Sequence, residues 1–130
     1  MNEQISYYRR KLEFEIDSWD LYEAINRGDE ITVIDARSAE SFKNEHIPDA
    51  ISLPHRDMNE KSTDGFDKSV LYVTYCDGIG CNASTKGALN MATPGFKVKE
   101  LIGGLEWWKR DGYQTKGDKA NSGKAITCGC

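Results

Sequence analysis

The sequence predicts an α/β fold in which helices cover both faces of a parallel β-sheet. Short runs of apolar and β-branched residues, at 31–34 and 70–75, indicate buried strands. Segments with helical spacing lie between such runs, and Gly or Pro residues mark the ends of several elements. Strands that alternate with helices are joined by right-handed crossovers into a parallel sheet.

The first half of the chain contains six predicted elements. Leu12, Phe14 and Ile16 alternate with glutamates, which predicts a short edge strand. In chain order we expect a helix over 2–11, this edge strand, a helix capped at 17 or 18 and ending at Gly28, a strand over 31–34, a helix from Ser38 to about 45, and a strand over 50–53.

The second half begins with a polar, irregular segment at 55–68. We then expect a strand over 70–75, a Gly-containing loop at 77–81, a helix from 82 to 91 or 92, a strand over 98–102 and a helix over 105–110. Residues 116–127 are rich in Lys, Gly, Asn and Ser. The predicted organisation is therefore one domain over 1–115 and a flexible tail over 116–130 that ends in Cys-Gly-Cys.

Composition excludes several classes of function. The chain is 38% hydrophobic and 29% charged, which is typical of a folded domain. Its net charge of −4 argues against nucleic acid as a partner, and Arg9, Arg10 and Lys11 suit the solvated face of a helix. We find no apolar run long enough for a membrane span and no secretory signal, so we expect a cytoplasmic protein with no membrane partner.

Four cysteines, Cys76, Cys81, Cys128 and Cys130, are the chain's most reactive side chains. In the cytoplasm, where thiols are kept reduced, we expect all four to be free thiols that are available for chemistry. No metal or organic cofactor is implied, because two paired thiolates do not complete a zinc site.

The surroundings of Cys76 favour a reactive thiolate. Cys76 follows a predicted strand, and sites in open parallel sheets form beyond the carboxyl ends of strands. Gly78 and Gly80 allow a tight loop with inward N–H groups, and the next helix adds unpaired donors. Such a cradle stabilises an anion and lowers the pKa of a cysteine thiol. The alternative is a small buried cysteine that only ends a core strand.

Three segments together resemble the single-domain rhodaneses, over about residues 12–113. They are Val33-Ile34-Asp35-Ala36-Arg37 with Glu40, Phe42, the run at 46–51 and Pro54; Tyr75-Cys76 with the Gly-rich loop; and Leu101-Ile102-Gly103-Gly104-Leu105 with Trp107, Trp108 and Gly112. The resemblance implies a rhodanese-like three-layer fold with about five parallel strands. It also implies that Cys76 accepts sulfur as a persulfide, which makes the protein a sulfurtransferase.

The active-site loop departs from the family in its charge. Its residues are Asp77, Gly78, Ile79, Gly80, Cys81 and Asn82, without the Arg or Lys that helps many rhodaneses to bind thiosulfate. Asp77 would repel a dianionic donor if it pointed inward, and we expect it to face solvent or to cap loop amides. A protein-bound persulfide or another small thiol donor is therefore favoured over thiosulfate, with a thiol as the acceptor.

Loop length raises a phosphatase or arsenate-reductase-like alternative. Related phosphatases place an Arg six positions after the cysteine to clamp a phosphate. Asn82 occupies that position here and supplies no charge, which argues against this alternative.

Four other residues are candidates for the rim of the site. Asp35 and Arg37 follow a strand; they line the site or are structural, with Arg37 bridging Glu40 and a backbone carbonyl. His55 and Arg56 follow Pro54, and Arg56 could supply the positive charge that the loop lacks.

The remaining cysteines have two interpretations each. Cys81 is a resolving thiol for a persulfide on Cys76, or a small residue packed under the loop. Cys128 and Cys130 relay sulfur or form a disulfide, or have no role. If these cysteines form regulatory disulfides with Cys76, the protein is instead a non-catalytic redox-sensing or interaction module.

Overall fold

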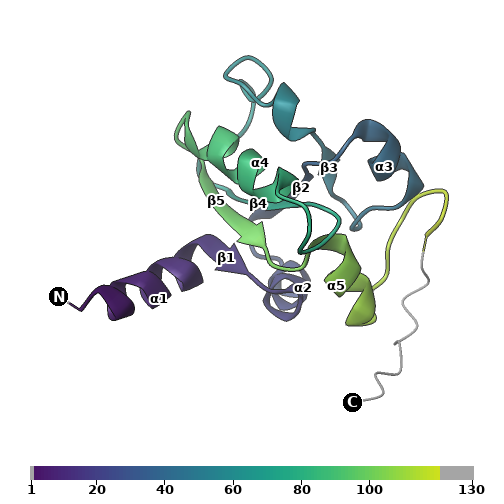
Figure 1. Ribbon diagram of the computed structural model, residues 1–130. Helices are drawn as coiled ribbons and strands as arrows, with labels where there is room; N and C mark the ends of the chain where they lie inside the picture. The colour runs from purple at the N-terminus through teal and green to yellow at the C-terminus, as the bar shows by residue number, and fades with distance from the viewer. Residues whose placement is uncertain (1, 121–130) are drawn as a thin grey trace.

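The alternating elements form one sheet in the computed structural model, which describes residues 2–120 (Figure 1). The strands are β1 (Glu15–Ile16), β2 (Ile31–Asp35), β3 (Ile51–Ser52), β4 (Leu71–Tyr75) and β5 (Lys97–Leu101). Their order is β1-β5-β4-β2-β3, and all neighbouring pairs are parallel. This sheet confirms the predicted fold class and the strand number that the resemblance implied.

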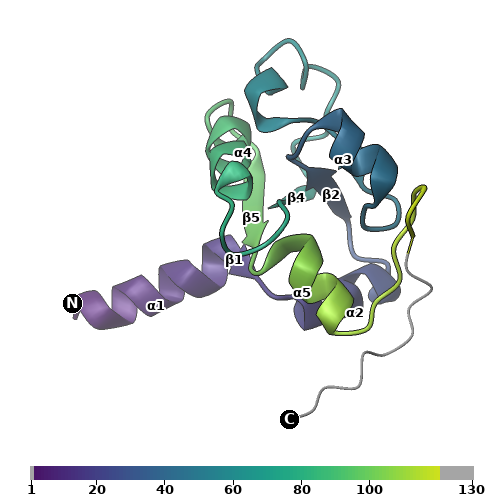
Figure 2. The same cartoon turned by 45° about the vertical axis from the view of Figure 1, so that its right-hand side comes forward.

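Helices cover both faces of the sheet (Figures 1 and 2). They are α1 (Glu3–Phe14), α2 (Ser18–Arg27), α3 (Ala39–Asn44), the 3-10 helix η1 (His55–Asp57), α4 (Ala83–Ala92) and α5 (Gly104–Arg110). The core contacts place α2 and α5 on one face, and α4 with η1 on the other. The result is the expected three-layer arrangement.

Successive strand residues belong to the two different cores. Val73 packs with the cluster that contains Leu21 of α2 and Trp108 of α5. The preceding residue, Tyr72, packs with Met91 of α4 on the opposite face. Because side chains alternate across a strand, a central strand that is apolar on both faces must be covered on both.

Local signals set the ends of α2 and α3 as predicted. Asp17 caps α2 by accepting a hydrogen bond from the N–H of Asp20 at 2.8 Å. Gly28 ends this helix with a φ of 78°, a left-handed conformation that favours glycine. Ser38 caps α3 by accepting from the N–H of Ser41.

The edge strand predicted over 12–16 is mostly wrong. Leu12 and Phe14 belong to α1, and only Glu15–Ile16 pair with β5. The helix continues because Lys11 and Glu15 form an ion pair one turn apart and Asn2 caps the N-terminal end. α1 contains no buried residue and projects away from the sheet (Figures 1 and 2).

The first residues of the predicted tail are bonded to the domain. The backbones of His46 and Lys116 exchange two hydrogen bonds of 2.9 Å. The N–H groups of Asp118 and Lys119 donate to the carbonyl oxygens of Lys43 and Asn44 at the end of α3. Ordered contacts therefore continue beyond the boundary predicted at residue 115. Cys128 and Cys130 lie outside the described residues.

Within residues 2–120, we find no helix with the length and apolar character that a membrane span requires.

Candidate active site

Two neighbouring strands end side by side and create the site. Asp35 of β2 is paired with Tyr75 of β4, and the N–H of Ala36 donates to the carbonyl oxygen of Tyr75 at 3.0 Å. Both strands end at the carboxyl edge of the sheet, where the sequence predicted the site. Cys76 comes next on β4 and is only 1% exposed.

A cavity of about 460 Å³ opens beside Cys76. It brings together Arg37, His55, Arg56, Asp77 and Cys81, all of which were candidates in the sequence. Asp35 lies behind this lining, where it is fully buried. The cavity thus collects residues from the ends of β2 and β4, from η1 and from the loop before α4.

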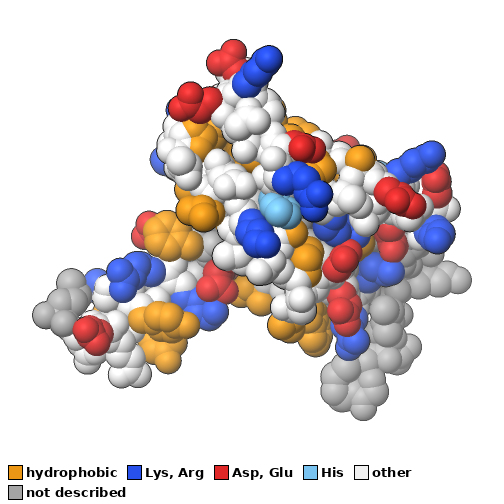
Figure 3. All heavy atoms as spheres, turned by 45° about the horizontal axis from the view of Figure 1, so that its top comes forward, with side chains coloured by type: hydrophobic (Ala, Val, Ile, Leu, Met, Phe, Trp, Pro, Cys, Tyr) orange, Lys and Arg blue, Asp and Glu red, His pale blue; other side chains and the backbone are white. Residues whose placement is uncertain are grey.

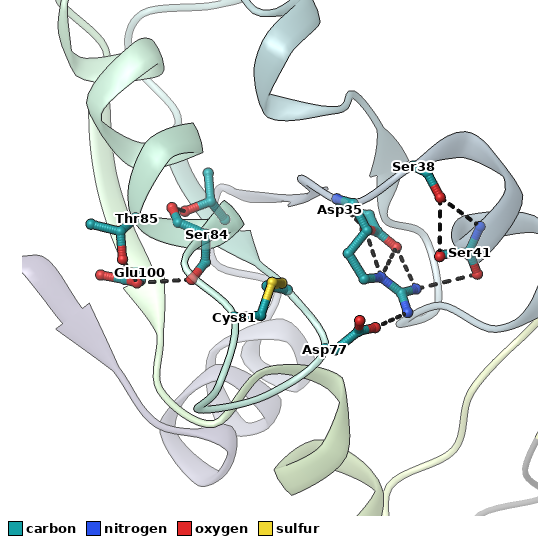
Figure 4. Close-up of a disulfide and its surroundings, with 11 residues drawn as sticks. Asp35, Ser38, Ser41, Asp77, Cys81, Ser84, Thr85 and Glu100 are labelled. Atoms are coloured by element: carbon teal, nitrogen blue, oxygen red, sulfur yellow. Dashed lines mark hydrogen bonds and ion pairs between the residues drawn. A yellow bond between two sulfur atoms is a disulfide. The ribbon is translucent and has the colours of Figure 1, made fainter.

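Cys76 and Cys81 are joined by a disulfide, with their Cα atoms 6.3 Å apart (Figure 4). The prediction of four free thiols is therefore wrong for this pair. The loop folds back because the N–H of Cys81 donates to the carbonyl oxygen of Gly78 at 3.3 Å. That turn brings the half-buried Cys81 side chain against Cys76, and not under the loop.

The glycines with the strictest backbone requirement near the loop are Gly103 and Gly104, which the sequence analysis did not assign to the site. Neither Gly78 nor Gly80 has a positive φ, whereas Gly103 and Gly104 both do. At Gly104 a Cβ atom would overlap the carbonyl oxygen of Cys76. Only glycine therefore allows this close approach. Two adjacent glycines before a helix were the available signal.

The close approach lets α5 bind the loop from below. The N–H of Leu105 donates to the carbonyl oxygen of Cys76 at 2.9 Å. The N–H of Glu106 donates to the carbonyl oxygen of Asp77 at 2.8 Å. The first turn of a helix has N–H groups without partners inside the helix, and here two of them fix the start of the active-site loop.

The opposite end of the loop leads into α4. Asn82 is its N-cap residue but makes no side-chain capping bond, so the first N–H groups of α4 are left without that partner. The hydroxyls of Ser84 and Thr85 donate to Glu100 of β5 (Figure 4). They hold the start of α4 against the sheet.

Arg37 connects the ends of β2 and β4 through hydrogen bonds to Asp35 and Asp77, which are labelled in Figure 4. Its Nε and Nη2 donate to the Asp35 carboxylate at 3.0 and 2.7 Å, and its Nη1 donates to Asp77 at 2.8 Å. Its Nη2 also reaches the carbonyl oxygen of Glu45 at 2.5 Å. The predicted carbonyl contact is present, but Asp35 and Asp77 are the acidic partners in place of Glu40.

These contacts offset the positive charge of the Arg37 guanidinium. Burial would lower the pKa of Arg37, but the hydrogen bonds to Asp35 and then Asp77 outweigh it and raise this pKa above its ordinary value. The Asp77 side chain is 70% exposed, which agrees with the expectation that it faces solvent. It also forms an ion pair with Arg37. Two carboxylates therefore share one cation, which leaves little positive charge to attract an anion.

Tyr75 supports Asp35 from inside the core. Its hydroxyl donates to the Asp35 carboxylate at 2.8 Å and accepts from the N–H of Ile47 at 3.1 Å. Burial, and then the nearby charge of Asp35, raise the pKa of Tyr75 above its ordinary value. The sequence offered no signal for this contact, because a strand tyrosine usually needs no special explanation.

His55 and Arg56 line the same cavity as Arg37. The N–H of His55 donates to the carbonyl oxygen of Ala36 at 3.0 Å, and Asn90 of α4 donates to the carbonyl oxygen of His55 at 2.8 Å. These bonds fix η1 beside the site. Figure 3 shows a histidine side chain next to Lys or Arg side chains on one face of the molecule. Arg56 is the cavity's second cation.

Comparisons with known proteins agree with this architecture. The model of the rhodanese-like domain family matches residues 19–111. A curated relative, the thiosulfate sulfurtransferase GlpE of Coxiella burnetii, is 34% identical over 96 residues, which are 72% of this chain and 82% of the relative. The protein therefore belongs to the rhodanese-like domain family.

Solved structures show the same fold. A crystal structure of a protein from Bacillus halodurans is 42% identical, with a TM-score of 0.87 over 92% of this chain and 88% of that one. The solution structure of a rhodanese-like domain from Anabaena is 26% identical, with a TM-score of 0.72 over 81% of this chain and 80% of the other. Membership of this family supports assignment of the protein to the general class of sulfurtransferases.

Proposed function

We propose that the protein is a sulfurtransferase that carries sulfane sulfur as a persulfide on Cys76. The observation that carries this proposal is the position of Cys76, at the carboxyl end of a central strand and in the wall of a 460 Å³ cavity. The only other cysteine that lines this cavity, among the described residues, is Cys81. Loading therefore starts from the reduced form of this pair.

The reaction has two nucleophilic steps. The Cys76 thiolate attacks the sulfane sulfur of a donor, whose remaining part leaves with the electron pair of the broken sulfur bond. An acceptor thiolate then attacks the outer sulfur of the persulfide and restores the Cys76 thiolate. The first N–H groups of α4, which have no side-chain cap, stabilise the negative charge of the Cys76 thiolate and of its persulfide. The N–H of Cys81 is already bonded to Gly78, so it is left out of the predicted cradle.

Charge near the cavity favours a donor with little negative charge. The cavity lining includes the cations Arg37 and Arg56 and the carboxylates of Asp57 and Asp77. The carboxylate of the buried Asp35 offsets much of the positive charge of Arg37. A small persulfide or a persulfidated protein thus suits this site better than the thiosulfate dianion, although the Coxiella relative is named for thiosulfate. The acceptor is a thiol, and the cytoplasm, where thiols are kept reduced, suits the cycle.

Intact-mass analysis tests the proposal directly. Reduced protein is incubated separately with thiosulfate and with a small persulfide, and peptide mapping locates any added sulfur. We expect one sulfur atom on Cys76 from the persulfide, measured in Cys81→Ser as well as in the parent protein, and slower loading from thiosulfate. Cys76→Ser should remain unloaded, whereas Tyr7→Phe, which changes an exposed residue of α1 outside the cavity lining, should load normally. Absence of added sulfur on Cys76 with both donors, in the parent protein and in Cys81→Ser alike, would contradict the proposal.

A redox-sensing module is the second candidate, and the Cys76–Cys81 disulfide is the observation that favours it. A sensor would form this disulfide with an oxidant and would carry no sulfur. The loading experiment separates the two functions, because a sensor stays at its reduced mass with either donor. Asn82 lies at the position that a phosphatase fills with Arg, and it supplies no charge.

A further inference from the structure

We propose that Cys81 converts the Cys76 persulfide into free hydrosulfide, so that the protein acts as a sulfane-sulfur reductase. This inference rests on the proposed function, because it begins with sulfur already loaded on Cys76. Its structural basis is the bond between the two sulfur atoms. A side chain that can bond to Cys76 Sγ can also attack that atom when it carries an extra sulfur.

The step balances without any added reagent. The Cys81 thiolate attacks Cys76 Sγ, which is the inner sulfur of the persulfide. A bond forms between the two Sγ atoms, and the bond from Cys76 Sγ to the outer sulfur breaks. The outer sulfur leaves with the electron pair as HS⁻ and takes the proton that the Cys81 thiol gave up on becoming the thiolate. The outer sulfur is reduced, and the two cysteines are oxidised to the disulfide seen in the structure.

The loop is held by hydrogen bonds at its start and exposed at its tip, which suits this exchange. The carbonyl oxygens of Cys76 and Asp77 are held by α5. At the tip, Ile79 is 75% exposed, and a Cβ at Gly80 would meet no atom within 4 Å. A small shift of Cys81 away from Cys76, to make room for the extra sulfur, would therefore cost little packing at the tip.

Burial determines which sulfur a reductant attacks to close the cycle. Cys76 is 1% exposed, whereas Cys81 is half-buried and lies nearer to solvent. A dithiol reductant therefore attacks Cys81 Sγ, forms a mixed disulfide there and releases the Cys76 thiolate. Its second thiol then displaces Cys81 and leaves as the oxidised dithiol. One turnover converts one sulfane sulfur and one dithiol into hydrosulfide and a disulfide.

A competing step would give a different product. If Cys81 attacked the outer sulfur, the persulfide would move to Cys81 and no hydrosulfide would form. The direct Sγ–Sγ bond of the structure favours attack on the inner atom.

Single-turnover loading without reductant tests the inference. Reduced full-length protein, freed of small thiols, is loaded with thiosulfate labelled in its sulfane sulfur, or with a labelled small persulfide. Labelled sulfide and the Cys76–Cys81 disulfide are then measured over time. We expect about one sulfide per loaded sulfur and an equal amount of disulfide. Cys81→Ser and Cys81→Ala should load but release sulfide at least about tenfold more slowly.

A Cys128→Ser/Cys130→Ser double variant keeps Cys81 and should release sulfide like the parent protein. Equal release by the parent and the Cys81 variants, or a stable persulfide on Cys81, would overturn the inference while leaving the proposed function intact. If no variant that retains Cys76 loads any sulfur, the proposed function fails, and this inference fails with it.

Discussion

The N–H of Leu105 donates a hydrogen bond to the carbonyl oxygen of Cys76, at 2.9 Å. This bond exists because Gly104 places the start of α5 directly against the active-site loop. The nucleophile is thus positioned by a helix that contributes no side chain to the chemistry we propose. Four further features of the site and its supports, with this one, lead to testable predictions.

Replacing Gly104 with alanine should damage both stability and sulfur loading. The new Cβ would overlap the backbone of Cys76, and φ at this position is 58°. We expect a loss of about 2–4 kcal/mol in the free energy of unfolding, from overpacking and backbone strain together. Urea denaturation measures the loss. Gly28→Ala is the matched control, because φ there is 78° but no atom lies within 4 Å, so only about 1 kcal/mol should be lost, from backbone strain alone.

Arg37 and Asp77 should differ sharply in their effects on stability, although they form one ion pair. Arg37→Ala leaves the fully buried Asp35 carboxylate without its cation, which should cost about 3–5 kcal/mol. Asp77→Asn removes a partner whose side chain is 70% exposed, so the loss should stay below about 1 kcal/mol. Similar losses for the two variants in urea denaturation would show that burial of Asp35 is not what makes Arg37 important.

Asp77→Asn should also change the choice of donor. Removing this carboxylate leaves Arg37 with Asp35 alone and makes the cavity rim more positive. We expect kcat/KM for thiosulfate to rise by about three- to tenfold at low salt, with a smaller change for a small persulfide. The gain should shrink as salt is added. Asp64→Asn, which lies at a different cavity, should leave both donors unaffected.

Tyr75 should make the protein less stable in alkali. Burial and Asp35 raise the pKa of Tyr75 in the folded state, so the unfolded chain loses this phenol proton first, near its usual pKa of about 10. The contribution of Tyr75 to the free energy of unfolding is fully present below about pH 10. Above that pH it falls by about 1.4 kcal/mol per pH unit, until the pH reaches the pKa of Tyr75 in the folded protein. Urea denaturation between neutral and alkaline pH measures the slope. Tyr75→Phe should reduce it, whereas Tyr7→Phe on the exposed α1 should not.

Shortening the chain should show where the domain ends. A chain that stops at residue 115 loses the backbone bonds of Lys116, Asp118 and Lys119 to α3 and His46. We expect it to be less stable, by about 1–3 kcal/mol, than a chain that stops at residue 120. Equal thermal unfolding of the two chains would mean that these bonds contribute nothing, and that the boundary predicted at 115 is adequate.

Much of the fold could be predicted because its signals are local. The β-branched run of β2, the cap at Asp17 and the glycine at position 28 each act within a few residues. The same holds for the position of Cys76 after β4. The error at Leu12 and Phe14 arose because a short alternating run satisfies a strand pattern while also continuing a helix.

The details of the site depend on contacts between distant parts of the chain. Arg37 and Asp77 are 40 residues apart, and they meet only because β2 and β4 pair in the register that sets Asp35 beside Tyr75. No local pattern specifies that register. The spacing of Cys76 and Cys81 permitted either a bond or a packed thiol, and the turn at Gly78 decided between them.

Helix α1 extends outward, and none of its residues lines the cavity beside Cys76. Its N-terminal end is therefore a suitable attachment point for immobilising the protein. Protein anchored to a bead or a sensor chip through this end would keep its cavity open to the solution. Persulfidated proteins could then be passed over the immobilised domain and screened as donors without cutting, tagging or blocking the reactive edge of the sheet.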